Sequence, residues 1–136
     1  STNTLHLHGQ ILNSRSTKTN KQYPLKTYEL NIGDYCEQRS QLRPDVVWFG
    51  EDVPNMVLAE DICKSADILI VIGTSLSVYP AANIIDYVPT NCKKNLIDPK
   101  EISQNELIDF TLIKEKASIG VPILTTKLME ISSTEQ

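Results

Sequence analysis

The stretch from Asp67 to Ser75, Asp-Ile-Leu-Ile-Val-Ile-Gly-Thr-Ser, decides the fold. Its apolar run, residues 68–72, is rich in β-branched side chains and apolar on both faces, as in the central strand of a parallel sheet. The run ends at Gly73, Thr74 and Ser75, and parallel sheets bind ligands beyond the carboxyl ends of their strands. We therefore predict a buried central strand followed by a ligand-binding turn, although such a turn can also simply cap a strand.

Helix and strand patterns alternate on both sides of this run. A buried-type strand over Val46–Phe49, closed by Gly50, precedes it, and a helix opened by Pro54 follows that strand. Further on, the sequence predicts a short helix from Pro80 to about Tyr87, strands at 95–97 and 110–113, and a closing amphipathic helix near 121–131. This alternation is typical of an α/β fold with a doubly wound parallel sheet.

The segment before residue 42 has a different character. Residues 4–8 alternate, which predicts a strand with His6 and His8 on one face. Residues 13–41 are mostly polar, which indicates a projecting strand-and-loop module or, equally, a mobile loop.

Composition limits the function classes. The 136 residues carry a net charge of -4, which disfavours a nucleic-acid or anionic membrane surface, and no apolar run is long enough to span a membrane. The three cysteines are widely spaced and form no Cys-x-x-Cys pair, so we expect a reducing, cytoplasmic compartment. The first residues form no signal-peptide pattern, and the sequence has no initiating methionine. We therefore expect the chain to start within a longer protein.

Two further features carry candidate chemistry. His6 and His8 suit proton transfer near neutral pH, but they could also be surface or core histidines, or share a metal ion if other ligands existed. Asp98 follows the strand at 95–97, where a carboxylate can grip ribose hydroxyls, or where Asp98-Pro99 can make a turn.

Three motifs in register then resemble the sirtuin family of NAD-dependent protein deacylases. They are His8-Gly9, the string Leu42–Glu51, and Gly73–Leu76 with Val78–Ala82. The resemblance runs from Leu5 to about Leu128, and its His-x-His-Gly string is closest to bacterial members.

The resemblance implies the C-terminal half of a Rossmann-like sheet, NAD as the cofactor and an acyl-lysine protein or peptide as the substrate. In this family the acyl group passes to ADP-ribose and nicotinamide is released. His8 would be the general base, and Val47 would accept a hydrogen bond from the substrate through its carbonyl. Phe49 would line a substrate tunnel, with Gly50, Glu51 and Val78 flanking the substrate backbone. The expected NAD contacts are Gly73, Thr74, Ser75, Asp98, and Ala117 and Ser118 in a late loop near adenine.

The sequence departs from the family pattern in two ways. The four zinc cysteines are reduced to Cys36, with Ser16 near the place of the first, so residues 1–41 are predicted to form a zinc-free module held by its own strand pairing. Residues 42–136 would be the C-terminal part of the NAD-binding domain. With the other half of the site missing, we expect the chain alone to be inactive, and to pair with that half or to self-associate. The alternatives are a non-catalytic module that binds NAD, ADP-ribose or an acyl-peptide, and a metal-dependent hydrolase that uses His6 and His8.

Overall fold

The chain forms two compact units in a computed structural model that describes residues 2–74, 79–100 and 109–134. The units are Ser1–Val57 and Leu58–Gln136, and the division falls inside the helix α1 (Met56–Cys63). It therefore lies well after the sequence boundary at 41/42, because the strand that begins at Leu42 pairs within the first unit. Two predicted site residues, Ser75 and Val78, lie outside the described residues.

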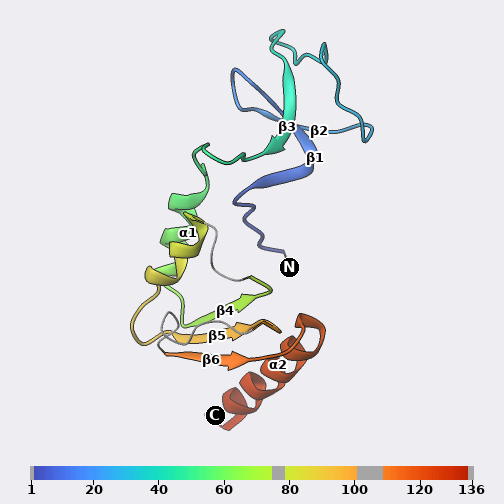
Figure 1. The fold of residues 1–136 in the computed structure, drawn as a ribbon. Helices are drawn as coiled ribbons and strands as arrows, with labels where there is room; N and C mark the ends of the chain where they lie inside the picture. The colour runs from blue at the N-terminus through green and yellow to red at the C-terminus, as the bar shows by residue number, and fades with distance from the viewer. Residues whose placement is uncertain (1, 75–78, 101–108, 135–136) are drawn as a thin grey trace. The chain divides into compact units, whose positions relative to one another are not determined.

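The first unit is built on a three-stranded antiparallel sheet in the order β2-β1-β3 (Figure 1). Its strands are β1 (Gly9–Ser16), β2 (Gln22–Pro24) and β3 (Leu42–Val46). The strand predicted at residues 4–8 is wrong, because β1 begins only at Gly9, whose φ of 83° turns the backbone. The side chains at 4–8 nevertheless alternate between exposed and half-buried, which is the pattern that produced the prediction.

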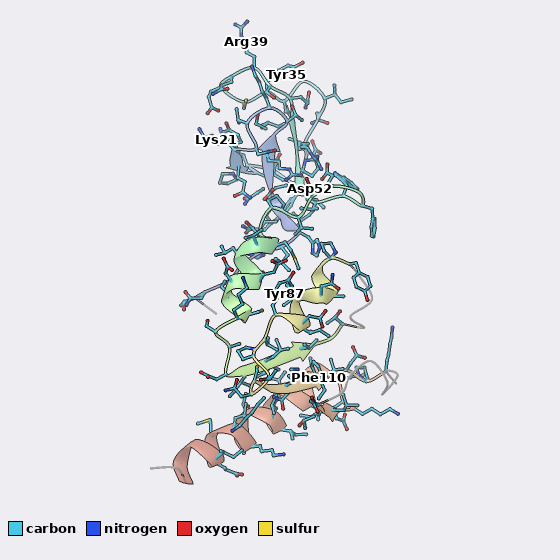
Figure 2. All side chains as sticks on the ribbon, turned by 90° about the vertical axis from the view of Figure 1, so that its left-hand side faces the viewer. Lys21, Tyr35, Arg39, Asp52, Tyr87 and Phe110 are labelled. Atoms are coloured by element: carbon cyan, nitrogen blue, oxygen red, sulfur yellow. The ribbon has the colours of Figure 1, made fainter. Side chains whose placement is uncertain are left out.

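Short polar contacts join the residues that lie between β1 and β3 to one another. The fully buried Ser16 hydroxyl accepts hydrogen bonds from the N–H groups of Lys18 and Thr19, each at 3.2 Å. Thr17 and Ser40 share a hydroxyl hydrogen bond of 2.8 Å, and the Cys36 N–H donates to the Ser40 carbonyl at 2.9 Å. Figure 2 labels Lys21, Tyr35 and Arg39 in this segment. Strand pairing and hydroxyl contacts thus hold the module together.

The second unit contains a parallel sheet in the order β4-β5-β6 (Figure 1). The strands are β4 (Ile68–Ile72), β5 (Lys93–Ile97) and β6 (Phe110–Ile113), and the helical elements are the 3-10 helix η1 (Ala81–Asp86) and α2 (Ala117–Thr134). The predicted ranges of β4 and β6 are confirmed without a shift. The alternation of helix and parallel strand confirms the α/β class.

The core of this unit lies on one face of the sheet. Val71 and Leu96 are buried there, with Leu69, Ile85 and Phe110 packed against them. On the other face α2 approaches closely at Gly120, where an added Cβ would lie 2.4 Å from Cγ2 of Ile97. No side chain larger than hydrogen fits at this crossing.

The position of β4 differs from the prediction. In the described part of the chain β4 pairs only with β5, so it is an edge strand and not a central one. Its isoleucines at 68, 70 and 72 share one face and are 42%, 38% and 44% exposed. An apolar edge strand with an open face is a typical surface for a further strand or helix.

The described residues include no helix with the length and apolarity needed to cross a membrane.

Candidate functional site

Backbone pairing brings His8 beside Val47 in the first unit. The His8 carbonyl accepts a hydrogen bond from the Val47 N–H at 3.0 Å, one step beyond the pair formed by Gly9 and Val46. Gly9 makes this possible, because an added Cβ would lie 2.1 Å from the Asp45 carbonyl oxygen. The His8 side chain is exposed. The predicted base and a predicted substrate contact therefore lie on neighbouring strand ends.

The Phe-Gly-Glu string forms a tight turn. The Glu51 N–H donates to the Trp48 carbonyl at 3.1 Å, and Gly50, the third residue of the turn, has a φ of 86°. A turn with positive φ at its third residue favours glycine there. The predicted strand over Val46–Phe49 is therefore wrong: β3 ends at Val46, and the next residues lead into a turn.

Trp48 and Phe49 are presented to the outside of the first unit. Trp48 is 57% exposed and Phe49 is 98% exposed. The buried environment expected for these two side chains is therefore wrong within this unit. Aromatic side chains on a tight turn, exposed without an apolar cover, are typical of a contact surface for another molecule.

An ion-pair cluster underlies the turn. Arg43 binds the Glu51 carboxylate at both oxygens, with Nη1 to Oε1 at 2.5 Å and Nη2 to Oε2 at 3.0 Å. Arg15 reaches Oε2 at 3.1 Å, and the Trp48 N–H donates to the same oxygen at 3.0 Å. The hydrogen bonds from Arg43 and Trp48 lower the pKa of Glu51 to about 2. Glu51 is thus an anion tied under the turn by its side chain.

Both arginines also bind the end of β3. The Val46 carbonyl accepts from Nη2 of Arg15 at 3.2 Å and from Nη2 of Arg43 at 3.0 Å. Sequence reasoning missed both residues as part of the site. Arg43 stands eight positions before Glu51 in the motif, but nothing local to Arg15 indicates its contact with Glu51 across 36 positions.

A cavity of about 320 Å³, lined by polar and apolar residues, lies in the first unit beside this cluster. Its buried acidic side chain is that of Asp45, only 2% exposed, which accepts from the Gln22 side chain at 2.8 Å and from the Gln10 N–H at 3.3 Å. Arg15 also lines the cavity, and its Nε is buried with no hydrogen-bond partner among the described residues. The cavity also contacts His6 and Val47.

The second unit carries the predicted nucleotide contacts at strand ends. Gly73 follows β4 with a φ of 64°, an added Cβ there would meet nothing within 4 Å, and its N–H donates to the Ile97 carbonyl at 2.9 Å. Thr74, next to it, is exposed. Asp98 follows β5 and accepts from the Lys100 N–H at 2.8 Å, which is the turn contact weighed as its alternative role. The carboxyl ends of β4 and β5 therefore carry Gly73, Thr74 and Asp98 on one edge of the parallel sheet.

Ala117 and Ser118 begin α2, so the prediction that they lie in a loop is wrong. Both are exposed. The loop before them is short, because β6 ends at Ile113.

Metal ligands do not gather in the described residues, where no group of three or more His, Cys, Asp and Glu side chains could hold an ion. His6 and His8 belong to no such group among those residues. In the small module the buried Cys36 thiol lies 3.7 Å from the Ser16 hydroxyl, a donor set that does not fit a zinc site of four thiolates. Burial raises the pKa of Cys36, but hydrogen bonds from the backbone of Ser40 and Gln38 and from Ser16 outweigh it, so the pKa is lowered.

Comparison with known proteins gives a consistent result. The sequence profile described as "Sir2 family" matches residues 1–80. The chain is 40% identical over 131 residues to an NAD-dependent protein deacylase of Helicobacter pylori strain J99, covering 96% of this chain and 56% of that protein. It is 37% identical over 135 residues to an NAD-dependent protein deacylase of Bacteroides thetaiotaomicron, covering 95% and 58%.

Comparison with solved structures points to the same family. A Sir2 homolog in complex with NAD is 35% identical with a TM-score of 0.69, over 82% of this chain and 45% of that one. A mutant Sir2 homologue in complex with ADP-ribose is 32% identical with a TM-score of 0.75, over 94% and 53%. The chain thus spans about half the length of the curated relatives it matches.

Proposed function

Because this chain belongs to the Sir2 family, we propose that it is part of an NAD-dependent protein-lysine deacylase, which transfers the acyl group of a modified lysine to ADP-ribose and releases nicotinamide. The observation that carries the proposal is the pairing of His8 with Val47 next to the clamped Trp48–Glu51 turn. This arrangement sets an exposed imidazole, the side chain best suited to proton transfer near neutral pH, beside an exposed aromatic turn.

In this proposal the first unit handles the substrate. His8 acts as the general base on a ribose hydroxyl, since its imidazole is exposed and can reach a bound ligand. Val47 and the turn with Phe49, Gly50 and Glu51 bind the acyl-lysine peptide along its backbone, as an added strand pairs with an open edge. Val78 is proposed for the same role from the similarity of its motif alone.

The second unit would hold the nucleotide. NAD, when bound, supplies the ribose carbon that receives the acyl group and nicotinamide as the leaving group. Gly73 fits this role because its positive φ and open surroundings let a ligand approach the backbone closely, and Asp98 offers a carboxylate to ribose hydroxyls. Thr74 and Ser75 would add hydroxyl donors, and Ala117 and Ser118, at the start of α2, would lie near adenine.

A protein partner is part of the proposal. The open face of β4, with its three exposed isoleucines, is expected to be covered by the part of the enzyme that the relatives have and this chain lacks, or by a second copy of the chain. We also propose a bacterial, cytoplasmic protein, supported by the bacterial relatives and by three unpaired cysteines.

A turnover assay tests the proposal. The chain is mixed with the part of the Helicobacter pylori relative that it does not match, together with NAD and an acetyl-lysine peptide, and mass spectrometry follows acetyl-ADP-ribose and nicotinamide. We expect products from the mixture, none from the chain alone, and none when the chain carries His8→Ala; His6→Ala is the matched control and should retain turnover. A mixture that forms a complex by size-exclusion chromatography yet releases no product overturns the deacylase proposal. Equal turnover from the chain alone, or failure of the two parts to associate, overturns the proposal of a missing half.

A further inference from the structure

We infer that Arg15 and Arg43 are positioning residues for the acyl-lysine peptide, because they lock Glu51 beneath the Trp48–Glu51 turn before any peptide arrives. The inference rests on the proposed function for the identity of the peptide. It adds two residues to which no role in the reaction has been assigned.

The first step concerns the geometry of the clamp. Arg43 holds both carboxylate oxygens of Glu51 in a two-point contact, which fixes orientation as well as distance. Arg15 adds a third guanidinium contact at 3.1 Å. The carboxylate therefore has little freedom to rotate.

The second step connects the carboxylate to the turn. Glu51 Oε2 also accepts the Trp48 N–H, and the Glu51 N–H returns a hydrogen bond to the Trp48 carbonyl. Glu51 thus closes the turn by its side chain and by its backbone. Phe49, which is 98% exposed, and Gly50 lie between these two anchors and take their positions from Trp48 and Glu51.

The third step concerns the strand end. Because both guanidinium groups also donate to the Val46 carbonyl, they fix the backbone immediately before Val47. The two arginines come from different strands, Arg15 from β1 and Arg43 from β3, and they pair across the sheet. The sheet, the end of β3 and the turn therefore form one connected unit.

The charges around Glu51 favour its ionised form. Arg15 and Arg43 carry two positive charges against Glu51, and Asp45 acts on Arg43 as a further negative group. These charges balance without a ligand, so Glu51 needs no bound peptide to hold it under the turn. A turn that is already ordered costs less entropy when a peptide binds.

The experiment uses Trp48, the single tryptophan, as a reporter inside the turn. Chain labelled with fluorinated tryptophan gives one fluorine NMR signal, whose line shape reports the order of the turn with or without the complementing part described above. The variants are Arg43→Gln, Arg43→Lys, Arg15→Gln and Glu51→Gln. The matched control is Lys21→Gln, which removes an exposed ion pair with Glu37 in the same unit.

We expect Arg43→Gln to convert the sharp Trp48 signal to exchange-broadened or multiple signals, while far-UV circular dichroism stays unchanged. The dissociation constant for the acetyl-lysine peptide should rise about tenfold and that for ADP-ribose should stay within about twofold, because only the peptide meets the turn. Arg43→Lys should restore part of the effect, since lysine keeps the charge but not the two-point contact. Lys21→Gln should change nothing.

An unchanged Trp48 signal in Arg43→Gln overturns the clamp, and so does equal weakening of peptide and ADP-ribose. If Arg43→Gln unfolds the first unit, the Trp48 signal of Glu51→Gln without peptide decides, because that variant removes the anion and keeps both arginines; an unchanged signal overturns the clamp. Absence of turnover in every sample, wild type included, is a failure of the proposed deacylase alone, since the NMR signal and the binding constants do not depend on catalysis.

Discussion

The His8 carbonyl oxygen lies 3.0 Å from the Val47 backbone nitrogen, and this hydrogen bond continues the pairing of β1 with β3 beyond the first residue of β1 and the last residue of β3. The bond depends on Gly9, which has positive φ and lies against the Asp45 carbonyl. One glycine therefore sets the spacing between an exposed histidine and the segment that leads to the aromatic turn. This dependence can be measured.

Replacing Gly9 by alanine should destabilise the first unit. The new Cβ would overlap the Asp45 carbonyl, and alanine is strained at a φ of 83°. We expect a loss of about 2 kcal/mol or more in the free energy of unfolding. Urea titration followed by Trp48 fluorescence measures it, since this single tryptophan lies in the first unit.

Gly33→Ala is the matched control. Gly33 also has positive φ, 104°, but an added Cβ meets nothing within 4 Å, so only backbone strain is introduced. If the urea midpoint of Gly9→Ala is no lower than that of Gly33→Ala, the close contact with Asp45 does not affect stability.

Acid should loosen the aromatic turn in a defined pH range. Glu51 has a folded-state pKa of about 2, depressed from an ordinary value of about 4.3. A group with a depressed folded pKa contributes stability that is present above the unfolded pKa and is lost as the pH falls through the folded pKa. We therefore expect the first unit to lose stability between about pH 4 and pH 2, read from urea midpoints by Trp48 emission.

The variant Glu51→Gln supplies the comparison for that titration. It should be less stable at neutral pH, because a neutral amide pairs weakly with Arg43 and Arg15, and its stability should vary less over the same acid range. Glu37, also with a pKa of about 2 through Lys21 and Tyr23, titrates in the same range, so Glu51→Gln retains that part of the slope. Identical pH curves for the two proteins would exclude Glu51 as a contributor.

These residues also show what the sequence could predict. The run at 68–72 and the segment at 110–113 are β-strands at the predicted bounds, because an unbroken apolar run rich in β-branched residues and a short apolar segment between polar ones leave few alternatives. Residues 4–8 kept the predicted alternation of burial but not the hydrogen bonding of a strand. The sequence pattern reports which side chains face inward, and Gly9 decides where the ladder begins.

The site was only partly predictable for a similar reason. The motif predicts substrate contacts at Val47, Phe49 and Glu51, whereas the apolar composition of Val46–Phe49 predicts a buried strand. Gly50 is the residue in this segment that predicts a turn, and the observed structure follows Gly50 and not the apolar composition of residues 46–49. The contact of Arg15 with Glu51 joins residues 36 positions apart, and no local pattern encodes it.

Gly120→Ala should destabilise the second unit. Gly120 lies where α2 crosses the sheet, and an added Cβ would lie 2.4 Å from Cγ2 of Ile97 and 3.2 Å from Cγ2 of Ile113. Ile97 is fully buried and cannot move aside freely, so the overlap should outweigh the better helix propensity of alanine. We expect a loss of about 1–3 kcal/mol, measured by the helical circular dichroism signal during urea unfolding. The control Thr126→Ala changes an exposed residue of the same helix, and a Gly120→Ala midpoint equal to that of the control would contradict the close crossing.

The open face of β4 should govern self-association. Ile68, Ile70 and Ile72 expose apolar surface on one face of an edge strand, so chains are expected to associate through it as concentration rises. Ile70→Asp places a charge at the centre of that face, and its partial exposure lets the strand keep its fold. Sedimentation velocity over a concentration series should show the wild-type chain shifting toward larger species and Ile70→Asp remaining monomeric. Ile32→Asp, at a residue that is 99% exposed in the first unit, should associate like the wild type. A wild-type chain that stays monomeric throughout would contradict self-association, and an Ile70→Asp chain that associates as well as the wild type would place the association surface elsewhere.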